Sequence, residues 1–289
     1  MFAIIGPTAS GKSDLAIKLA LKLGYEILSL DSLSIYKEVD IASAKPSKDE
    51  LSLVKHYGID EIYPNEKFDV NKFINIYKKI QHDKIIIVGG TGFYLKAMIE
   101  GISTMPKISE EIKQKAKKGN YETLKRIDPA FAAKISPNDS YRIQKGLEIF
   151  YATSTPPTQY FKLNPPKPVL PDIPIFEIEV KRDVLRERIK KRTEKMFKNG
   201  LIDEVAYLEK KYRDRRLPAL KAIGVKEVLD YFNGKYDYES LKEKIITNTA
   251  RLAKRQQIFN KTQFKNKISA PLEKLEEKIL DYLHTGKKP

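Results

Sequence analysis

Short apolar runs alternate with helical patterns along the first hundred residues. Three of these runs are predicted strands, and they cover residues 2–5, 26–30 and 85–88. Leu15, Leu19 and Leu23 recur at helical spacing between the first two strands, and residues 73–80 predict a second helix before the third strand. Strands that alternate with helices in this way favour a parallel sheet covered by helices, an α/β fold.

The pattern changes after Gly101. Short amphipathic segments broken by proline and charged residues follow, and seven of the 16 prolines lie between Pro156 and Pro174. Because proline ends helices and is excluded from central strands, this passage predicts a boundary. A strand pattern returns at residues 175–180, and long helices follow. We therefore expect a core made of residues 1–103 and 171–289, with a mostly helical insertion domain at residues 104–170 that leaves through the proline-rich passage.

Composition narrows the class of protein. The 289 residues include no Cys, which excludes a disulfide scaffold, a thiolate metal site and a cysteine nucleophile. No apolar run reaches the ~18 residues of a membrane span, so we expect a cytoplasmic protein with no membrane partner. Of the 54 basic and 38 acidic side chains, 29 and 16 lie in residues 181–289. This positive excess fits a polyanionic partner or a solvated surface, and charge alone leaves both open.

The turn after the first strand carries a phosphate-binding motif. Its sequence GPTASGKS matches G-x-x-x-x-G-K-[ST] and lies between a predicted strand and a predicted helix, as this motif requires. Its backbone N–H groups are expected to wrap a phosphate, while Lys12 adds a charge and the Ser13 hydroxyl binds Mg²⁺. The motif predicts a P-loop NTPase-like core and leaves the identity of the phosphate open. Its residues are Gly6, Pro7, Thr8, Ala9, Ser10, Gly11, Lys12 and Ser13.

The ends of the predicted strands bear on the class of P-loop protein. A P-loop ATPase usually carries a metal-binding carboxylate after an apolar strand, whereas residues 85–88 run into Gly89-Gly90-Thr91-Gly92. This difference disfavours a motor. Asp31 instead follows the second strand, near the crevice where α/β sheets bind ligands. From the residues alone, two roles for Asp31 remain possible. It can be a helix cap or surface group, or it can be a catalytic group.

Three passages taken together resemble one enzyme family. GPTASGKS at residues 6–13, DSLSIYKEVDIASAKP at 31–46 and GGTGFYLKAMIEG at 89–101 are similar to the tRNA dimethylallyltransferases, also called tRNA isopentenyltransferases. Shorter matches follow in family order over nearly the whole chain, at residues 127–129, 136–139, 188–196, 200–204, 222–226 and 253–256. Two departures are Ala42-Ser43, where the family usually has Gly-Thr, and Gln257-Ile258-Phe259, where it commonly has a Trp.

The resemblance implies transfer of a dimethylallyl group from its diphosphate to N6 of the adenosine 3′ of a tRNA anticodon. The P-loop would then bind the donor diphosphate and need not hydrolyse ATP. Because adenine N6 is a poor nucleophile, we expect Asp31 to act as general base, with Thr91 beside the reacting centre. Lys12, Ser13 and Mg²⁺ would stabilise charge on the departing diphosphate. The expected partners are dimethylallyl diphosphate and the tRNA anticodon stem-loop, and we expect a monomer.

Further binding residues follow from the same resemblance. Arg188 and Arg192 lie one helical turn apart beside an apolar stripe, so one face can pack while the other reaches phosphate; a solvated face is the alternative. His56 has no assigned role. The expected tRNA-binding residues are Asp31, Ser32, Leu33, Ser34, Thr91, Lys113, Tyr141, Arg142, Ile143, Gln144, Lys145, Lys221, Ala222, Ile223, Gly224, Val225 and Lys226.

Three other functions stay open at this point. An adenylate isopentenyltransferase shares the loop and the base but modifies a free nucleotide, and a P-loop kinase of small molecules can also have an acid after its second strand. A nucleic-acid-binding protein could use the P-loop as a nucleotide switch. The helical insertion and the basic last third favour an RNA substrate, since a small substrate needs no extended basic surface.

Overall fold

The computed structural model describes residues 1–90 and 92–286. They form two compact units, one of Met1–Lys96 with Asp172–Pro289 and one of Ala97–Pro171. Residues 104–170, the expected insertion, fall within the smaller unit. No helix in the described ranges is long and apolar enough to cross a bilayer.

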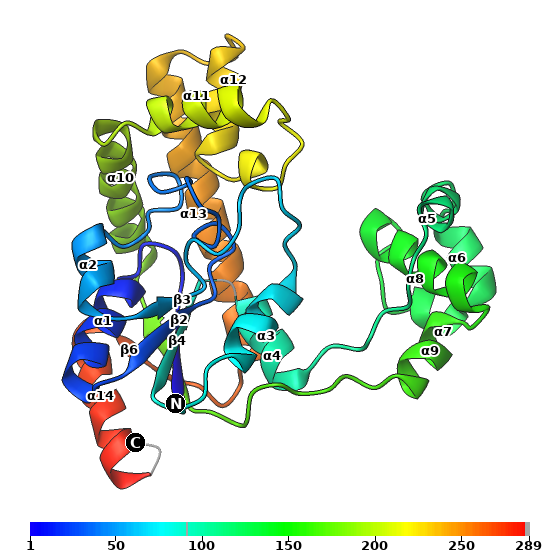
Figure 1. Ribbon diagram of the computed structural model, residues 1–289, viewed down its shortest axis with the longest axis horizontal. Coiled ribbons are helices and arrows are strands. Elements are labelled where there is room, and N and C mark those ends of the chain that lie inside the picture. The colour runs from blue at the N-terminus through cyan, green and yellow to red at the C-terminus, as the bar shows by residue number, and fades with distance from the viewer. Residues whose placement is uncertain (91, 287–289) are drawn as a thin grey trace. The chain divides into compact units, whose positions relative to one another are not determined.

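The larger unit is built on one six-stranded sheet (Figure 1). All strand pairings in it are parallel, and the order is β3-β2-β4-β1-β5-β6. This confirms the predicted α/β class. The strands are β1 (Phe2–Ile5), β2 (Glu26–Ser29), β3 (His56–Tyr57), β4 (Ile85–Gly89), β5 (Ile175–Glu179) and β6 (Ile268–Pro271). β6 is not among the predicted strands, because two buried residues in four give too short an alternation to recognise.

Helices flank this sheet and connect its strands. The leucine pattern of the first helix is confirmed, because Leu15 and Leu19 are buried against Phe2 and Ile4 of β1. The rings of Phe2 and Phe176 meet edge to face, 5.8 Å between centroids, and join β1 to β5. The elements are α1 (Lys12–Leu23), α2 (Lys48–Leu53), α3 (Val70–Lys78), α4 (Gly92–Glu100), α10 (Arg182–Lys198), α11 (Leu201–Tyr212), η1 (Ala219–Lys221), α12 (Val225–Phe232), α13 (Tyr238–Gln263) and α14 (Leu272–Thr285).

The basic last third of the chain supplies a pair of long helices. α10 and α13 lie side by side in Figure 1, and Leu185 and Ile189 of α10 pack with Ala253 of α13. This packing uses the apolar stripe of α10, so the arginines on its adjacent face remain available for other contacts.

The strand order decides which loops meet. β4 lies between β1 and β2 in the sheet. Because the carboxyl ends of parallel strands share one edge, the P-loop after β1, Gly89-Gly90 at the end of β4 and Asp31 after β2 all lie at that edge. This edge is therefore the candidate site.

The smaller unit, Ala97–Pro171, contains five helices beyond α4 among its described residues. Its helices are α5 (Glu110–Lys117), α6 (Tyr121–Ile127), α7 (Pro129–Ala132), α8 (Ser140–Thr153) and α9 (Pro157–Leu163). Ala116, Leu124 and Leu147 form its core. Buried Asp128 caps α7 through Phe131 N at 2.8 Å and also accepts hydrogen bonds from the backbone and hydroxyl of Thr158. The family-like segment at residues 127–129 thus has a structural role here.

Candidate functional site

The P-loop presents the N-terminus of α1. Ala9 and Gly11 have positive φ angles of 62° and 94°, and Gly11 is the N-cap residue. Because glycine has no side chain to cap the helix, the first N–H groups of α1 remain available to an anion. The loop therefore has the geometry of a phosphate cradle, as its sequence predicts.

Three cationic side chains surround this loop. Lys12 Nζ donates to Pro7 O at 2.7 Å. Arg188 Nη1 donates to Ser10 O at 3.0 Å, and Arg192 Nη1 donates to Thr8 Oγ1 at 3.3 Å. The two arginines come from α10, about 180 residues along the chain, and both reach the P-loop as the sequence pattern allowed. Positive charge thus concentrates where a diphosphate would bind.

The surroundings of Lys12 disfavour the charged form of its ammonium group. Burial lowers the pKa of its ammonium from 10.5 to about 8, the positive charge of Arg192 lowers it further within that shift, and Asp31 acts in the opposite direction. Burial also lowers the pKa of Arg192, which Asp31 again opposes. A bound anion would offset both the burial and the mutual repulsion, because it places negative charge beside two desolvated cations.

Asp31 begins the segment that follows β2. Its Oδ1 accepts hydrogen bonds from the backbone N–H groups of Leu33 at 2.8 Å and Ser34 at 3.0 Å, which fold the chain into a tight turn. The second carboxylate oxygen has no such structural bond among the described contacts. The carboxylate is therefore held in orientation by one oxygen while the other is available to a substrate.

One cavity of about 360 Å³ joins these groups. Lys12 and Ser13 line it from the P-loop, Asp31 and Ser32–Ser34 from the end of β2, and Gly89-Gly90 from the end of β4. Arg192 contributes from α10. A phosphate cradle and an oriented carboxylate thus share a volume of the size that takes a small organic ligand.

Gln256 and His56 also line this cavity, and neither was nominated from sequence. Gln256 on α13 accepts the N–H of Thr8 with Oε1 at 2.8 Å, and its amide nitrogen lies so near Gly90 that a Cβ there would come within 2.8 Å. Only its place in the AKRQ match at residues 253–256 signalled it. His56 also lines the cavity; its Nδ1 lies 2.7 Å from Val54 O, and burial lowers its pKa, so the ring is neutral with Nδ1–H as the donor.

The structure distributes the expected tRNA-binding residues unevenly. Ser32, Leu33, Ser34, Lys221, Ala222 and Ile223 line the cavity with Asp31. Gly224 and Val225 are buried and Lys226 is exposed. Thr91, expected beside the reacting centre, lies outside the described residues.

The expected contacts of the insertion all lie in the smaller unit. Tyr141 and Arg142 are exposed at the start of α8. Lys113 pairs with Glu110, while Gln144 and Lys145 bond buried Glu148. Ile143 is a core side chain of α8 at 6% exposure, and its expected contact with tRNA stays a prediction.

The oxygen donor at the start of α1 fits a magnesium ion that binds together with a phosphate ligand. Ser13 is exposed in the first turn of α1 and lines the cavity. No group of three or more His, Cys, Asp or Glu side chains that could hold a metal occurs among the residues the structure describes. Mg²⁺ commonly binds with few protein ligands, substrate phosphates and water completing its shell. Ser13 therefore offers a hydroxyl oxygen that could bind such an ion beside a phosphate ligand.

Comparison with known proteins agrees with this geometry. A family model described as IPP transferase matches residues 34–263. The tRNA dimethylallyltransferase of Nautilia profundicola is 82% identical over 280 residues, which cover 97% of this chain and 99% of that protein. The full-length tRNA isopentenylpyrophosphate transferase of Bacillus halodurans superposes with a TM-score of 0.68 at 28% identity, over 98% of this chain and 95% of that one. A eukaryotic dimethylallyltransferase, crystallised while acting on tRNA, shares the fold with a TM-score of 0.83 at 24% identity, over 99% of this chain and 80% of that one.

Proposed function

The chain belongs to the IPP transferase family, and from this premise we propose that it transfers a dimethylallyl group from dimethylallyl diphosphate to N6 of the adenosine 3′ of the anticodon in tRNA. The observation that carries the proposal is the single cavity in which the P-loop and Asp31 meet. A diphosphate in the cradle and an adenine against residues 31–34 would place donor carbon and nucleophile in the same volume.

The reaction forms one bond and breaks another. The N6 lone pair attacks C1 of the donor, and the C1–O bond breaks with its electron pair leaving on the diphosphate. Asp31 accepts the proton that N6 loses, because Asp31 lines the cavity and only one of its carboxylate oxygens, Oδ1, is bonded to the backbone. Lys12, Arg192 and the first amides of α1 stabilise the charge that builds on the leaving diphosphate.

Mg²⁺ bound at Ser13 would supply further charge neutralisation of the diphosphate. Arg188 does not line this cavity but lines a neighbouring one together with Ser10 and Gly11 of the P-loop, and its bond to Ser10 O supports the P-loop backbone. Gln256 supports the same loop through Thr8 N. These residues hold the cradle in shape before the donor arrives, which is how preorganised charge lowers a barrier.

An RNA substrate explains the charge of the last third of the chain. Lys221 belongs to that region and lines the cavity, so the basic surface reaches the reacting volume. The target adenosine must leave its stack to enter, since a cavity of about 360 Å³ takes one base and not a folded loop. We further place the enzyme in the cytoplasm, where its tRNA substrate resides.

The test is product analysis after incubating the protein with labelled dimethylallyl diphosphate, Mg²⁺ and either unmodified tRNA or AMP. We expect label on one adenosine of the tRNA and none on AMP. Label on AMP alone would assign the chain to nucleotide prenylation and leave the basic region unexplained. Phosphate release from ATP without label on either acceptor would overturn prenyl transfer and favour a kinase or switch.

Donor binding is expected to weaken above about pH 8, because the pKa of Lys12 is about 8 in the free protein. The donor diphosphate favours the charged ammonium and raises this pKa, so binding above pH 8 takes up a proton. Affinity should be level between about pH 7 and 8, where the diphosphate is fully ionised, and fall by up to about tenfold per pH unit above pH 8. Calorimetric titration with dimethylallyl diphosphate, without tRNA and in buffers of different ionisation enthalpy, measures the uptake.

A Lys12→Met variant is the control for that titration, since it removes the ammonium but leaves the ionisation of the ligand unchanged. Proton uptake near pH 9 should approach one per donor in the native protein and be much smaller in the variant. Equal uptake by both proteins would mean that another group carries the pH dependence.

A further inference from the structure

The segment after β2 must keep its shape without regular secondary structure. Residues 31–46, here called the 31–46 loop, begin with Asp31 and end where α2 starts. Asp31, Ser34 and Ser43 of this loop line the cavity. A loop of this kind is ordered only if its backbone polar groups find fixed partners.

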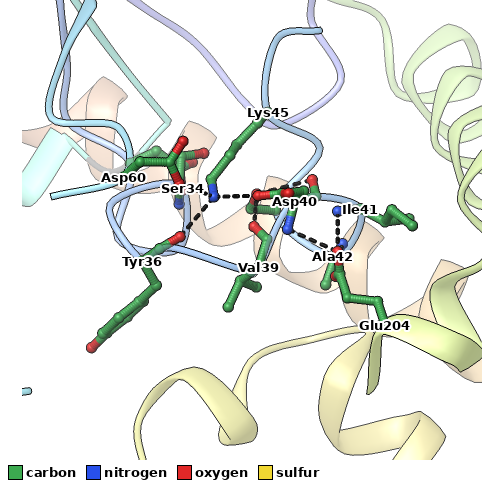
Figure 2. Close-up of polar contacts among 11 residues, drawn as sticks. Ser34, Tyr36, Val39, Asp40, Ile41, Ala42, Lys45, Asp60 and Glu204 are labelled. Carbon is green, nitrogen blue, oxygen red and sulfur yellow. Dashed lines mark hydrogen bonds and ion pairs between the residues drawn. The ribbon is translucent and has the colours of Figure 1, made fainter. Parts of the chain in front are cut away.

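Glu204 of α11 is the partner of three successive backbone amides in that loop. Its Oε2 accepts the N–H of Asp40 at 2.8 Å and of Ile41 at 2.7 Å, and its Oε1 accepts the N–H of Ala42 at 2.9 Å. Figure 2 shows the carboxylate of Glu204 pointing into the turn that residues 39–45 form, here called the turn. Bonds from an ionised carboxylate to N–H groups are among the stronger hydrogen bonds in proteins.

The other end of the turn is held by Lys45. Its side chain is only 4% exposed, and its ammonium donates to Tyr36 O at 2.7 Å, Asp40 Oδ1 at 2.7 Å and Asp60 Oδ1 at 2.6 Å (Figure 2). Lys45 therefore ties the turn to the rest of the loop, and all three of its donor hydrogens have partners. The turn is closed internally by Ser43 Oγ, which donates to Val39 O.

A second contact joins the same helix to the loop. Glu38, whose φ angle is 66°, accepts hydrogen bonds from Lys211 and from Tyr212 Oη at the end of α11. α11 thus contacts the loop near both of its ends, through Glu204 in its first turn and through Lys211 and Tyr212 in its last. The single helix α11 therefore fixes the position of the turn through contacts in its first and last turns.

This turn is connected to the diphosphate cradle through Arg192. Ser43 follows the three amides bound by Glu204, and Ser43 O accepts a hydrogen bond from Arg192 Nη2 at 3.2 Å. The same guanidinium donates to Thr8 of the P-loop through Nη1. Arg192 therefore bridges the turn and the cradle, and its orientation depends on where the Ser43 carbonyl points.

We propose that Glu204 is a positioning residue for the diphosphate site: by binding the amides of residues 40–42 it sets the Ser43 carbonyl, which aligns Arg192 over the P-loop. Glu204 acts through Arg192 and touches neither substrate. This inference rests on the proposed function of the cavity, since it concerns how the diphosphate is bound. The departure from the family at Ala42 is compatible with it, because Ala42 has no positive φ angle and its methyl group is buried.

Glu204→Gln tests the proposal because it changes charge and one donor-acceptor match but hardly changes size. If the amide oxygen keeps the N–H groups of Asp40 and Ile41, its NH₂ must face the N–H of Ala42, next to Ser43. We expect the Kd of inorganic diphosphate with Mg²⁺ and the KM of the donor each to rise about tenfold. This is the effect of losing one charge-assisted bond between Arg192 and the diphosphate. The KM of tRNA should stay within about twofold.

Asp203→Asn is the matched control, since it removes the neighbouring charge from the same first turn of α11. It should leave the Kd of diphosphate unchanged. Glu204→Asp keeps the charge but shortens the side chain, and we expect it to recover part of the affinity. If Glu204→Gln lowers the Tm while the Kd of diphosphate is unchanged, Glu204 is merely structural and the proposal is wrong. If the Gln variant fails to fold, the Asp variant decides by the same two measurements.

Coupling to Arg192 is the decisive readout. In an Arg192→Lys background, Glu204→Gln should change the Kd of diphosphate by less than about twofold, because the group through which it acts is already altered. If the fold-changes in the Kd of diphosphate caused by Glu204→Gln and by Arg192→Lys simply multiply in the double variant, the proposal is wrong. Diphosphate binding is measured without tRNA, so absence of prenyl transfer by the native protein would count against the proposed function and not against this coupling.

Discussion

Replacing Asp31 by Asn is expected to lower the single-turnover rate of prenyl transfer by about 10²–10⁴-fold, the usual contribution of a general base. Donor and tRNA affinities should be nearly unchanged. The reason is geometric: Asn retains an oxygen that can accept the N–H groups of Leu33 and Ser34, so the turn persists while the proton acceptor is lost. Rapid-quench measurement with enzyme in excess over tRNA reports the chemical step.

Asp69→Asn is a matched control for this experiment. Asp69 also accepts a backbone N–H two residues ahead, from Asn71 at 2.8 Å, but it is exposed at the start of α3 and does not line the cavity. Its variant should transfer the prenyl group at the native rate. A single-turnover rate for Asp31→Asn close to that of Asp69→Asn would exclude Asp31 as the base.

Replacing Lys12 by Met is expected to weaken binding of dimethylallyl diphosphate by about 100-fold or more, as for loss of one partner from a buried charge pair. Met fills nearly the same volume, so the packing of α1 should survive while the charge beside the cradle disappears. Calorimetry or fluorescence titration without tRNA measures the Kd directly. Turnover should also fall, since Lys12 is placed to stabilise the leaving diphosphate.

Lys22→Met provides the comparison on the same helix. Lys22 is exposed in the last turn of α1, and its ammonium lies 3.9 Å from Glu276 at the surface. Its removal should leave the donor Kd within about twofold, because a surface ion pair contributes little. Equal donor affinity for the Lys12 and Lys22 variants would contradict the assignment of the P-loop to the diphosphate.

Removal of Lys12 is also expected to affect stability with a defined sign. Its pKa is lower in the folded protein, about 8, than the ordinary 10.5. Folding therefore favours the neutral amine, and Lys12 by itself should contribute a gain in stability as the pH rises from about 8 toward 10.5, which is measured as the difference from the Lys12→Met variant. The Lys12→Met variant should lack this gain, so the donor-affinity comparison is best made at one pH below that window.

The motif-bearing part of the site could be predicted from sequence because its signals are local. The P-loop lies within eight residues between a strand and a helix, and the position of Asp31 at the end of β2 follows from the apolar run that precedes it. A strand needs only four to six residues of pattern, and parallel strands bring their carboxyl ends together whatever their order. The sequence by itself thus determined the α/β class and the P-loop, and through the family resemblance it nominated Asp31 as the candidate base.

Only the tertiary structure decided which distant side chains complete that site. Gln256 meets Thr8 across 248 positions, Arg192 meets Ser43 across 149, and Glu204 meets Ala42 across 162. Periodicity reports which face of a helix is buried but not which loop that face covers, because the pairing depends on how α10, α11 and α13 pack on one another and on the sheet. Arg188 and Arg192 could be expected to reach phosphate. Glu204 lies in the family-like segment at residues 200–204, but that match assigns it no role, and only the three amides that it binds show what it does.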